Sequence, residues 1–411
     1  MRTLGAASLA SLLAAVPAGA QPASADGGWP QYLGPARDGR AAQAAVFPAS
    51  GPVRLKEAWR KPIGVAGSAL SVLGETLVTL DSDEKGAGAI ALDARDGSVL
   101  WRVALDAEKL DEDRGPSSTP AVGSGLAYVL SPGCQLRALA LADGKQAWHV
   151  DLKAQFGANP RNGCASSPLL DGERLIVQTA APDDKRIVAL DSRTGALQWA
   201  AKGIARSNYS APGLRSASAR EVLVHHTDIT QGDPRGGVTA LRVEDGELAW
   251  HHTLDKFWSW ATPVPIEADR VLVLTWNDAA LVKAPKAGEA ASVVWRNPAF
   301  TAYVATPVYR DGHLYGHGGD YLRCVRVSDG TTAWEERTYP GSVSLVDGNL
   351  VALSVRAGLL RVVEATPQAY RERARLEVVE PGSRAEVSPT VVGRRIYVRN
   401  DEEVVAIDVE R

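Results

Sequence analysis

The chain has 411 residues, of which 45% are hydrophobic and 23% charged, as in a soluble globular protein with a large core. The formal net charge is −3, so the composition does not indicate a basic surface for nucleic acid. Three cysteines exclude a disulfide-dense scaffold and zinc motifs built from cysteine pairs.

The first 20 residues have the pattern of a secretory signal peptide. Arg2 precedes an apolar run over residues 4–16, and an Ala-x-Ala site ends at Ala20. We therefore expect cleavage near Ala20 and a mature protein that is periplasmic or secreted. Residues 21–54 are expected to form a leader segment that packs on one domain spanning residues 55–411. No later apolar run reaches 18 residues, so the sequence predicts no transmembrane segment.

A repeated phrase runs through the rest of the chain: a small residue, Leu, a turn that ends in Gly, and then Trp. The copies end at Trp101, Trp148, Trp199, Trp250 and Trp334, with a degenerate copy at Trp295. Each copy predicts two strands joined by a tight turn, and two further strand-like runs precede each copy. Four short antiparallel strands per repeat are typical of a β-propeller blade.

The spacing of the tryptophans predicts the number of blades. From Trp59 to Trp334 the mean interval is about 46 residues, and the last residues supply only three strands. The fourth strand is present at the other end of the chain, at residues 55–59. We therefore predict an all-β, eight-bladed propeller whose last blade is closed by the N-terminal strand, with seven blades as the alternative.

The Ala-Leu-Asp-x-x-x-Gly-x-x-x-Trp pattern resembles the tryptophan-docking repeat of the pyrroloquinoline-quinone-like (PQQ-like) propellers. The segment from Trp29 to Gly39 resembles the leader of secreted bacterial members. The resemblance implies a propeller fold in which the repeated indoles fill the wedges between blades. The family includes quinoprotein alcohol and glucose dehydrogenases and the non-catalytic propeller lipoprotein of the outer-membrane-protein assembly machinery.

The cysteines bear on the cofactor that this resemblance implies. Quinoprotein dehydrogenases of the family hold the quinone between an indole and a disulfide of two adjacent cysteines, with calcium beside it. Here Cys134, Cys164 and Cys324 are not adjacent, so PQQ and calcium remain possible without support from that feature. Cys134 and Cys164 fall in loops on the same face and can meet as a disulfide, whereas Cys324 is expected to be a buried thiol.

The histidines do not predict a metal site. In the pairs at residues 225–226 and 251–252, neighbours on a strand point to opposite faces, so neither pair chelates one metal by itself. His313 and His317 can share a strand face, but no second cluster has ligand spacing.

The loops that enter the innermost strands carry the candidate binding site. These strands begin with a Ser/Thr/Ala-Pro pair, and a basic residue stands five to seven positions before most of the prolines. Equal offsets in equivalent blades imply equal heights around the central channel. Cationic and aromatic side chains there suit an anionic or sugar-like ligand. The candidate residues are Arg114, Arg161, Asn162, Arg206, Asn208, Tyr209, Trp260 and Tyr303.

These observations favour an exported, non-catalytic and monomeric propeller that binds a protein partner or a small ligand through one face of the ring. The first alternative is a PQQ-dependent oxidoreductase acting on alcohols or sugars. The second is a carbohydrate-binding propeller that uses Trp258, Trp260 and Tyr303 as stacking surfaces.

Overall fold

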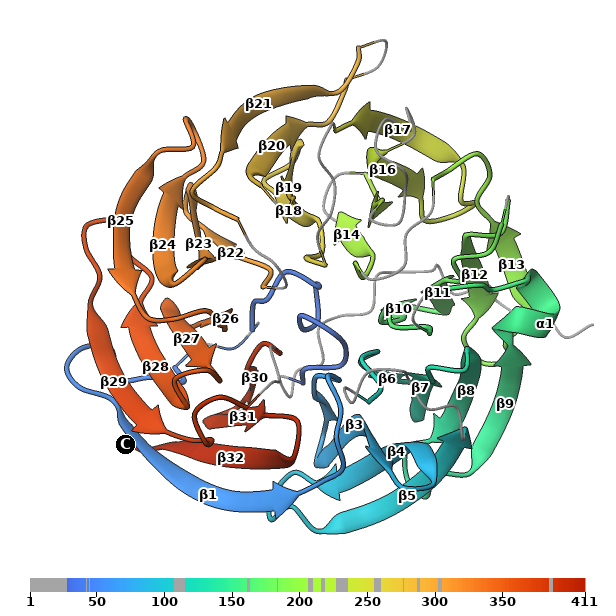
Figure 1. Ribbon diagram of the computed structural model, residues 1–411, viewed down its shortest axis with the longest axis horizontal. Helices are drawn as coiled ribbons and strands as arrows, with labels where there is room; N and C mark the ends of the chain where they lie inside the picture. Colours follow the sequence, from blue (N-terminus) through green and yellow to red (C-terminus); the bar gives the residue numbers. More distant parts are fainter. Residues whose placement is uncertain are drawn as a thin grey trace, which may run out of the picture.

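The computed structural model describes residues 28–41, 43, 45–106, 115–160, 163–182, 184–205, 210–215, 219–226, 236–254, 260–275, 277–286, 289–301, 305–383 and 387–410. Eight four-stranded antiparallel sheets stand around a common axis (Figure 1). This arrangement confirms the predicted eight-bladed propeller. Among the described residues, no helix is long and apolar enough to cross a membrane.

The strands follow one another from the axis outward in each blade, with the following bounds. Blade 1 contains β2 (Ser71–Leu73), β3 (Thr76–Asp83), β4 (Gly86–Asp93) and β5 (Val99–Asp106); blade 2 contains β6 (Ala121–Gly123), β7 (Leu126–Leu130), β8 (Gln135–Ala140) and β9 (Gln146–Asp151). Blade 3 contains β10 (Leu169–Asp171), β11 (Arg174–Gln178), β12 (Ile187–Asp191) and β13 (Leu197–Ala200); blade 4 contains β14 (Gly213–Arg215), β15 (Glu221–His225), β16 (Gly237–Arg242) and β17 (Leu248–Thr253). Blade 5 contains β18 (Val264–Ile266), β19 (Arg270–Leu274), β20 (Ala279–Lys283) and β21 (Ser292–Asn297); blade 6 contains β22 (Val308–Arg310), β23 (His313–Gly318), β24 (Tyr321–Arg326) and β25 (Thr332–Arg337). Blade 7 contains β26 (Ser342–Val346), β27 (Asn349–Ser354), β28 (Leu359–Glu364) and β29 (Glu372–Glu377); blade 8 contains β30 (Thr390–Val392), β31 (Arg395–Arg399), β32 (Glu403–Glu410) and, as its outer strand, β1 (Arg54–Pro62). The short helix α1 (Leu152–Phe156) follows β9.

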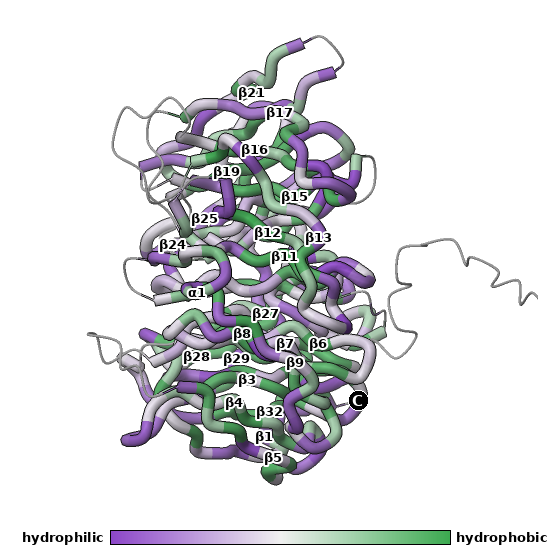
Figure 2. Tube along the Cα trace, turned by 90° about the vertical axis from the view of Figure 1, so that its right-hand side faces the viewer, coloured by the Kyte–Doolittle hydropathy of each residue, from purple (hydrophilic) through white to green (hydrophobic). Residues whose placement is uncertain are grey.

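The ring has two faces, which we name by their connections. The turn face carries the tight turns between the first and second and between the third and fourth strands of each blade. The loop face carries the connections between the second and third strands and those from one blade to the next. In the side view of Figure 2, hydrophobic residues follow the strands, while the ends of the blades are more hydrophilic.

The repeated tryptophans join neighbouring blades, as the sequence predicts. The indole N–H of Trp101 donates to the Leu141 carbonyl of the next blade at 2.9 Å, and that of Trp199 donates to the Val243 carbonyl at 3.0 Å. A glycine of the neighbouring turn lies against each ring: a Cβ at Gly246 would come within 2.3 Å of Trp199. The motif thus couples a tight turn in one blade to a buried indole from the blade before it.

Blades 4 and 7 depart from this pattern. Trp250 donates to the Glu221 carboxylate of its own blade at 3.0 Å rather than to a turn carbonyl of blade 5. In blade 7, Ala374 occupies the register position of the tryptophan, after a turn that is longer than in the regular repeats and lacks glycine. Leader residues Phe47 and Val53 pack into the core cluster that Ala374 adjoins, so the leader supplies the missing apolar volume there.

The ring closes as predicted, through strands from the two ends of the chain. Strand β1 pairs antiparallel with β32, from Arg54 opposite Glu410 to Pro62 opposite Glu403. Blade 8 therefore exists only when both ends of the domain are in place.

The leader crosses the centre of the ring on the turn face, where Figure 1 shows it in blue. Its hydrogen bonds reach blades 1, 2, 3, 4, 7 and 8, and it contacts blades 5 and 6 through Tyr32 and Gly39. The bonds join Trp29 to Val72, Pro30 to Val122, Gln31 to Leu170, Arg37 to Pro168 and Pro212, Gly39 and Ala41 to Leu345, and Gln43 to Gly393. One irregular segment is thereby bound to all eight blades.

Candidate functional site

Most of the binding site predicted at the loop face lies outside the described residues. The predicted site residues outside the described ranges are Arg114, Arg161, Asn162, Arg206, Asn208, Tyr209 and Tyr303. Two more of the basic residues before the prolines, Lys256 and Arg384, and the aromatic candidate Trp258 also lie there. Trp260 is described, and it is half-buried beside the buried Ala261. The ligand site on the loop face therefore stays a prediction.

The Ser/Thr-Pro pairs behind that site have a structural role in the described residues. The Thr119 amide donates to the Ser167 hydroxyl of the next blade at 2.9 Å, and the Ala69 amide donates to the Thr119 hydroxyl at 3.0 Å. The Thr262 amide likewise donates to Thr306 at 3.2 Å. These repeated bonds join neighbouring innermost strands around the axis, which gives the recurring Ser/Thr residues before the prolines a structural role.

Arg37 of the leader binds the residues that precede the innermost strands of blades 3 and 4. Its side chain is fully buried, and its guanidinium donates to the Pro212 and Pro168 carbonyls, each at 2.8 Å. Burial lowers the pKa of Arg37 to about 9, and the guanidinium stays protonated at neutral pH. Since its hydrogen-bond acceptors are carbonyl and amide oxygens, Arg37 anchors the leader by charge-assisted hydrogen bonds, mostly to the backbone.

The disulfide that the sequence allowed is present between Cys134 and Cys164. Both cysteines are buried in one core cluster between blades 2 and 3, with Tyr128 and Trp148. The quinoprotein arrangement needs an accessible disulfide of adjacent cysteines against the quinone face. The disulfide described here joins separated cysteines inside a core, so it does not fit that arrangement. Cys324 is a free, buried thiol, as predicted.

The buried histidines are held as neutral side chains. Burial lowers the pKa of His226 to about 3, and His226 and His251 both bond the Thr239 hydroxyl, at 2.6 and 3.0 Å. Burial also lowers the pKa of His317 to about 3, and its ring bonds the Thr338 hydroxyl at 3.1 Å. Within the described ranges, no group of three or more His, Cys, Asp or Glu side chains can hold a metal ion.

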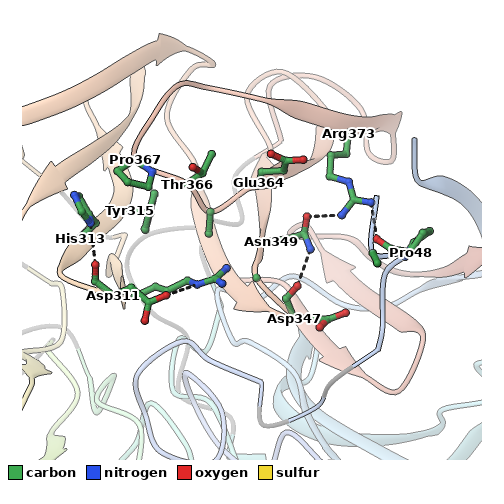
Figure 3. Close-up of a pocket in the computed structure, with 14 residues that line it drawn as sticks. Pro48, Asp311, His313, Tyr315, Asp347, Asn349, Glu364, Thr366, Pro367 and Arg373 are labelled. Carbon is green, nitrogen blue, oxygen red and sulfur yellow. Dashed lines mark hydrogen bonds and ion pairs between the residues drawn. The ribbon is translucent and has the colours of Figure 1, made fainter. Parts of the chain in front are cut away.

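A cavity of about 520 Å³ lies on the turn face where the repeat is broken (Figure 3). Its walls come from the β22–β23 turn of blade 6, from two turns and strand β29 of blade 7, and from the leader. The lining residues are Pro48, Ala49, Arg310, Asp311, His313, Tyr315, Asp347, Gly348, Asn349, Glu364, Ala365, Thr366, Pro367 and Arg373. The volume lies in the range of small-molecule sites.

Two arginines shape this cavity. Arg373 donates to Asn349 at 2.9 Å and to the Pro48 carbonyl at 2.6 Å, and so fixes the leader wall. The Arg310 guanidinium lies over Gly348, where a Cβ would come within 2.5 Å of its Nη1 atom. Its Nε donates to Asp311 at 3.1 Å.

The carboxylates around the cavity differ in how firmly they are held. Asp347 accepts from the Phe47 amide at 3.2 Å. Glu364 contacts Arg371 at 3.4 Å, and the Arg371 side chain is exposed while that of Glu364 is half-buried. In Figure 3, Asp311 and His313 lie on one side of the cavity and Arg373 on the other, with Glu364 between them.

The repeat pattern in the sequence does not predict this cavity. Its only signal is the absence of the glycine turn expected in blade 7, whose residues 364–367 line the cavity. The leader residues that complete the wall, Pro48 and Ala49, belong to no periodic pattern.

Comparisons with known proteins agree with this architecture. A family model described as outer membrane protein assembly factor BamB matches residues 85–259 and 256–411. An outer membrane protein assembly factor BamB of Moranella endobia is 23% identical over 284 residues, covering 66% of this chain and 66% of that protein. The quinohemoprotein alcohol dehydrogenase ADH IIB of Pseudomonas putida is 27% identical over 255 residues, covering 56% of this chain and 35% of that enzyme.

The first three curated relatives are matched over 19%, 35% and 66% of their own length. Among solved structures, BamB from Moraxella catarrhalis superposes with a TM-score of 0.62 at 16% identity, over 87% of this chain and 98% of that one. This likeness supports the fold. With the family model matching most of the propeller, the chain belongs to the PQQ-like propeller family described as outer membrane protein assembly factor BamB.

Proposed function

We propose that this protein is an exported, non-catalytic propeller that binds a protein partner on its turn face. The observation that carries the proposal is the charged cavity beside the leader, where blade 7 departs from the repeat. Places where a regular repeat breaks its own rules are frequent functional positions. The assembly-factor relatives, one of which matches over 66% of its length, support a partner-binding role. The predicted signal peptide supports export.

Site-specific photo-crosslinking in the native cell tests this proposal. A photoreactive residue replaces Ala49, which is exposed and lines the cavity. The matched control replaces Lys185, which is exposed in the β11–β12 connection on the loop face. We expect a discrete crosslinked protein from position 49 and none from position 185. Equal crosslinking from both positions, or none from position 49, would refute binding on the turn face.

The second candidate is a PQQ-dependent oxidoreductase, which the quinoprotein relatives favour. Titration of the mature protein with PQQ, with and without calcium and followed by tryptophan fluorescence, separates the two. Saturable quenching that calcium strengthens would support the oxidoreductase and justify a substrate screen. A carbohydrate-binding role through Trp258, Trp260 and Tyr303 stays a prediction for a glycan array.

A further inference from the structure

The cavity on the turn face presents two charges of opposite sign with spare hydrogen-bonding capacity. Arg310 engages Asp311 only through Nε, and its Nη1 and Nη2 groups have no partner among the described residues. The Arg310 side chain is 35% exposed, so most of it packs against the wall while part of it remains open to the cavity. A guanidinium whose two terminal amino groups are unengaged is ready for a bidentate carboxylate.

Gly348 makes this orientation possible. It has a φ of +73° in the β26–β27 turn, and it presents no side chain beneath the guanidinium. Any Cβ at position 348 would collide with Nη1 of Arg310 and displace the guanidinium from its place in the cavity wall. The β26–β27 turn of blade 7 therefore leaves space at Gly348 for the Arg310 side chain of blade 6 to pack.

Glu364 supplies the second charge. Its contact with Arg371 is long, at 3.4 Å, and the two side chains are 37% and 58% exposed. An ion pair of this kind contributes little, so an incoming cation displaces it at small cost. Arg373, by contrast, is already held by Asn349 and by leader carbonyls, and it acts as part of the wall.

We propose that the cavity receives a peptide segment of the protein partner in which an acidic side chain stands beside a basic one. The carboxylate of that segment binds Arg310, and its ammonium or guanidinium group binds Glu364. A purely anionic ligand would face Asp311, Asp347 and Glu364, and a purely cationic ligand would face both arginines. Only a segment with both charges complements the walls. This inference rests on the proposed partner-binding function and adds the chemistry of the partner.

Blocked dipeptides test the charge requirement on the full mature protein. The probes are N-acetylated, C-amidated Lys-Glu, Lys-Gln, Gln-Glu and Gln-Gln, titrated at low salt by calorimetry or by NMR. We expect saturable binding of Lys-Glu that weakens about tenfold or more when either charge is removed. Added salt should weaken binding further because the site is open to solvent.

Variants then assign each charge to its residue. Arg310→Gln should make Lys-Glu bind no better than Lys-Gln, and Glu364→Gln should make it bind no better than Gln-Glu. The control variants are Arg326→Gln and Asp329→Asn, which remove an exposed ion pair of blade 6 outside the cavity lining. Both controls should bind Lys-Glu as the unmodified protein does, and unchanged melting temperatures verify that all four variants fold.

The outcomes separate this inference from the proposed function. Absence of saturable Lys-Glu binding, or binding that Arg310→Gln leaves unchanged, would overturn the charge assignment. If the crosslink from position 49 persists in Arg310→Gln, the partner binds the turn face by other contacts, and only this inference falls. If position 49 gives no crosslink in the unmodified protein, both the proposed function and this inference are refuted.

Discussion

The docking of a tryptophan on the glycine of the next blade can be tested by adding one methyl group. Gly246 has a φ of +72°, and a Cβ there would lie 2.3 Å from the Trp199 ring. Gly125 has nearly the same φ, +78°, but no atom lies within 4 Å of its Cβ position. The two glycines share a left-handed backbone conformation and differ only in the contact that a Cβ would make.

The magnitudes follow from this difference. An alanine in the left-handed region costs about 1–2 kcal/mol at either site. The gain from restricting the unfolded chain is common to both and cancels in the comparison. Only Gly246→Ala also forces the Trp199 ring to move, which adds about 1–3 kcal/mol of overpacking. We therefore expect Gly246→Ala to destabilise by about 1–3 kcal/mol more than Gly125→Ala.

Urea unfolding of the two variants, followed by tryptophan fluorescence and by circular dichroism, measures the difference. The same two variants in a Trp199→Leu background show whether the Trp199 ring causes the difference in unfolding free energy. With Trp199→Leu in place, the extra cost of Gly246→Ala should largely disappear, as a double-mutant cycle would report. Equal losses for the two glycine variants, or an extra cost that survives in the Trp199→Leu background, would refute the docking argument.

Three further predictions use other parts of the fold. Replacing both Cys134 and Cys164 by Ala should lower the unfolding free energy by about 4 kcal/mol, because the disulfide closes a loop with a sequence separation of 30; an unchanged urea midpoint would contradict this. Phe47→Ala should cost about 3–5 kcal/mol by emptying the blade 7 wedge, whereas a loss below 1 kcal/mol in the same assay would mean that the leader does not fill it. The depressed pKa values of His226 and His317, about 3 in the folded protein, mean that the unfolded chain binds protons first as pH falls. The free energy of unfolding should be insensitive to these histidines above about pH 7 and should fall by up to about 1.4 kcal/mol per histidine per pH unit below about pH 6.5. Urea midpoints measured from pH 7.5 to 5 test this, and His317→Gln should reduce the slope.

The sequence predicts the propeller well because each blade is built from local signals. The turn at Gly246 and the indole at Trp199 recur with the same spacing, and this spacing gives the blade count. Closure of the last blade follows from the missing strand after β32 and the extra one near Trp59. These features depend on periodicity, which a single sequence displays.

The path of the leader could not be predicted in the same way. Arg37 belongs to no repeat in the sequence, yet it is fully buried in the structure. Its position depends on carbonyl groups more than 130 residues away, and no local pattern encodes such contacts. The cavity is equally hidden, because it is lined by the irregular turn of blade 7 at residues 364–367 and by a leader segment that supplies a wall. The site predicted on the loop face rests mainly on residues outside the described ranges and stays a prediction.

Because β1 pairs with β32, the ring is closed only in a chain that contains blade 8 up to residue 410. A chain that stops before β30 leaves β1 with an unpaired edge and the first and seventh blades without a neighbour. Gln43 would likewise lose its bond to Gly393. Truncated products therefore expose strand edges and apolar wedges that proteases recognise, while full-length chains conceal them.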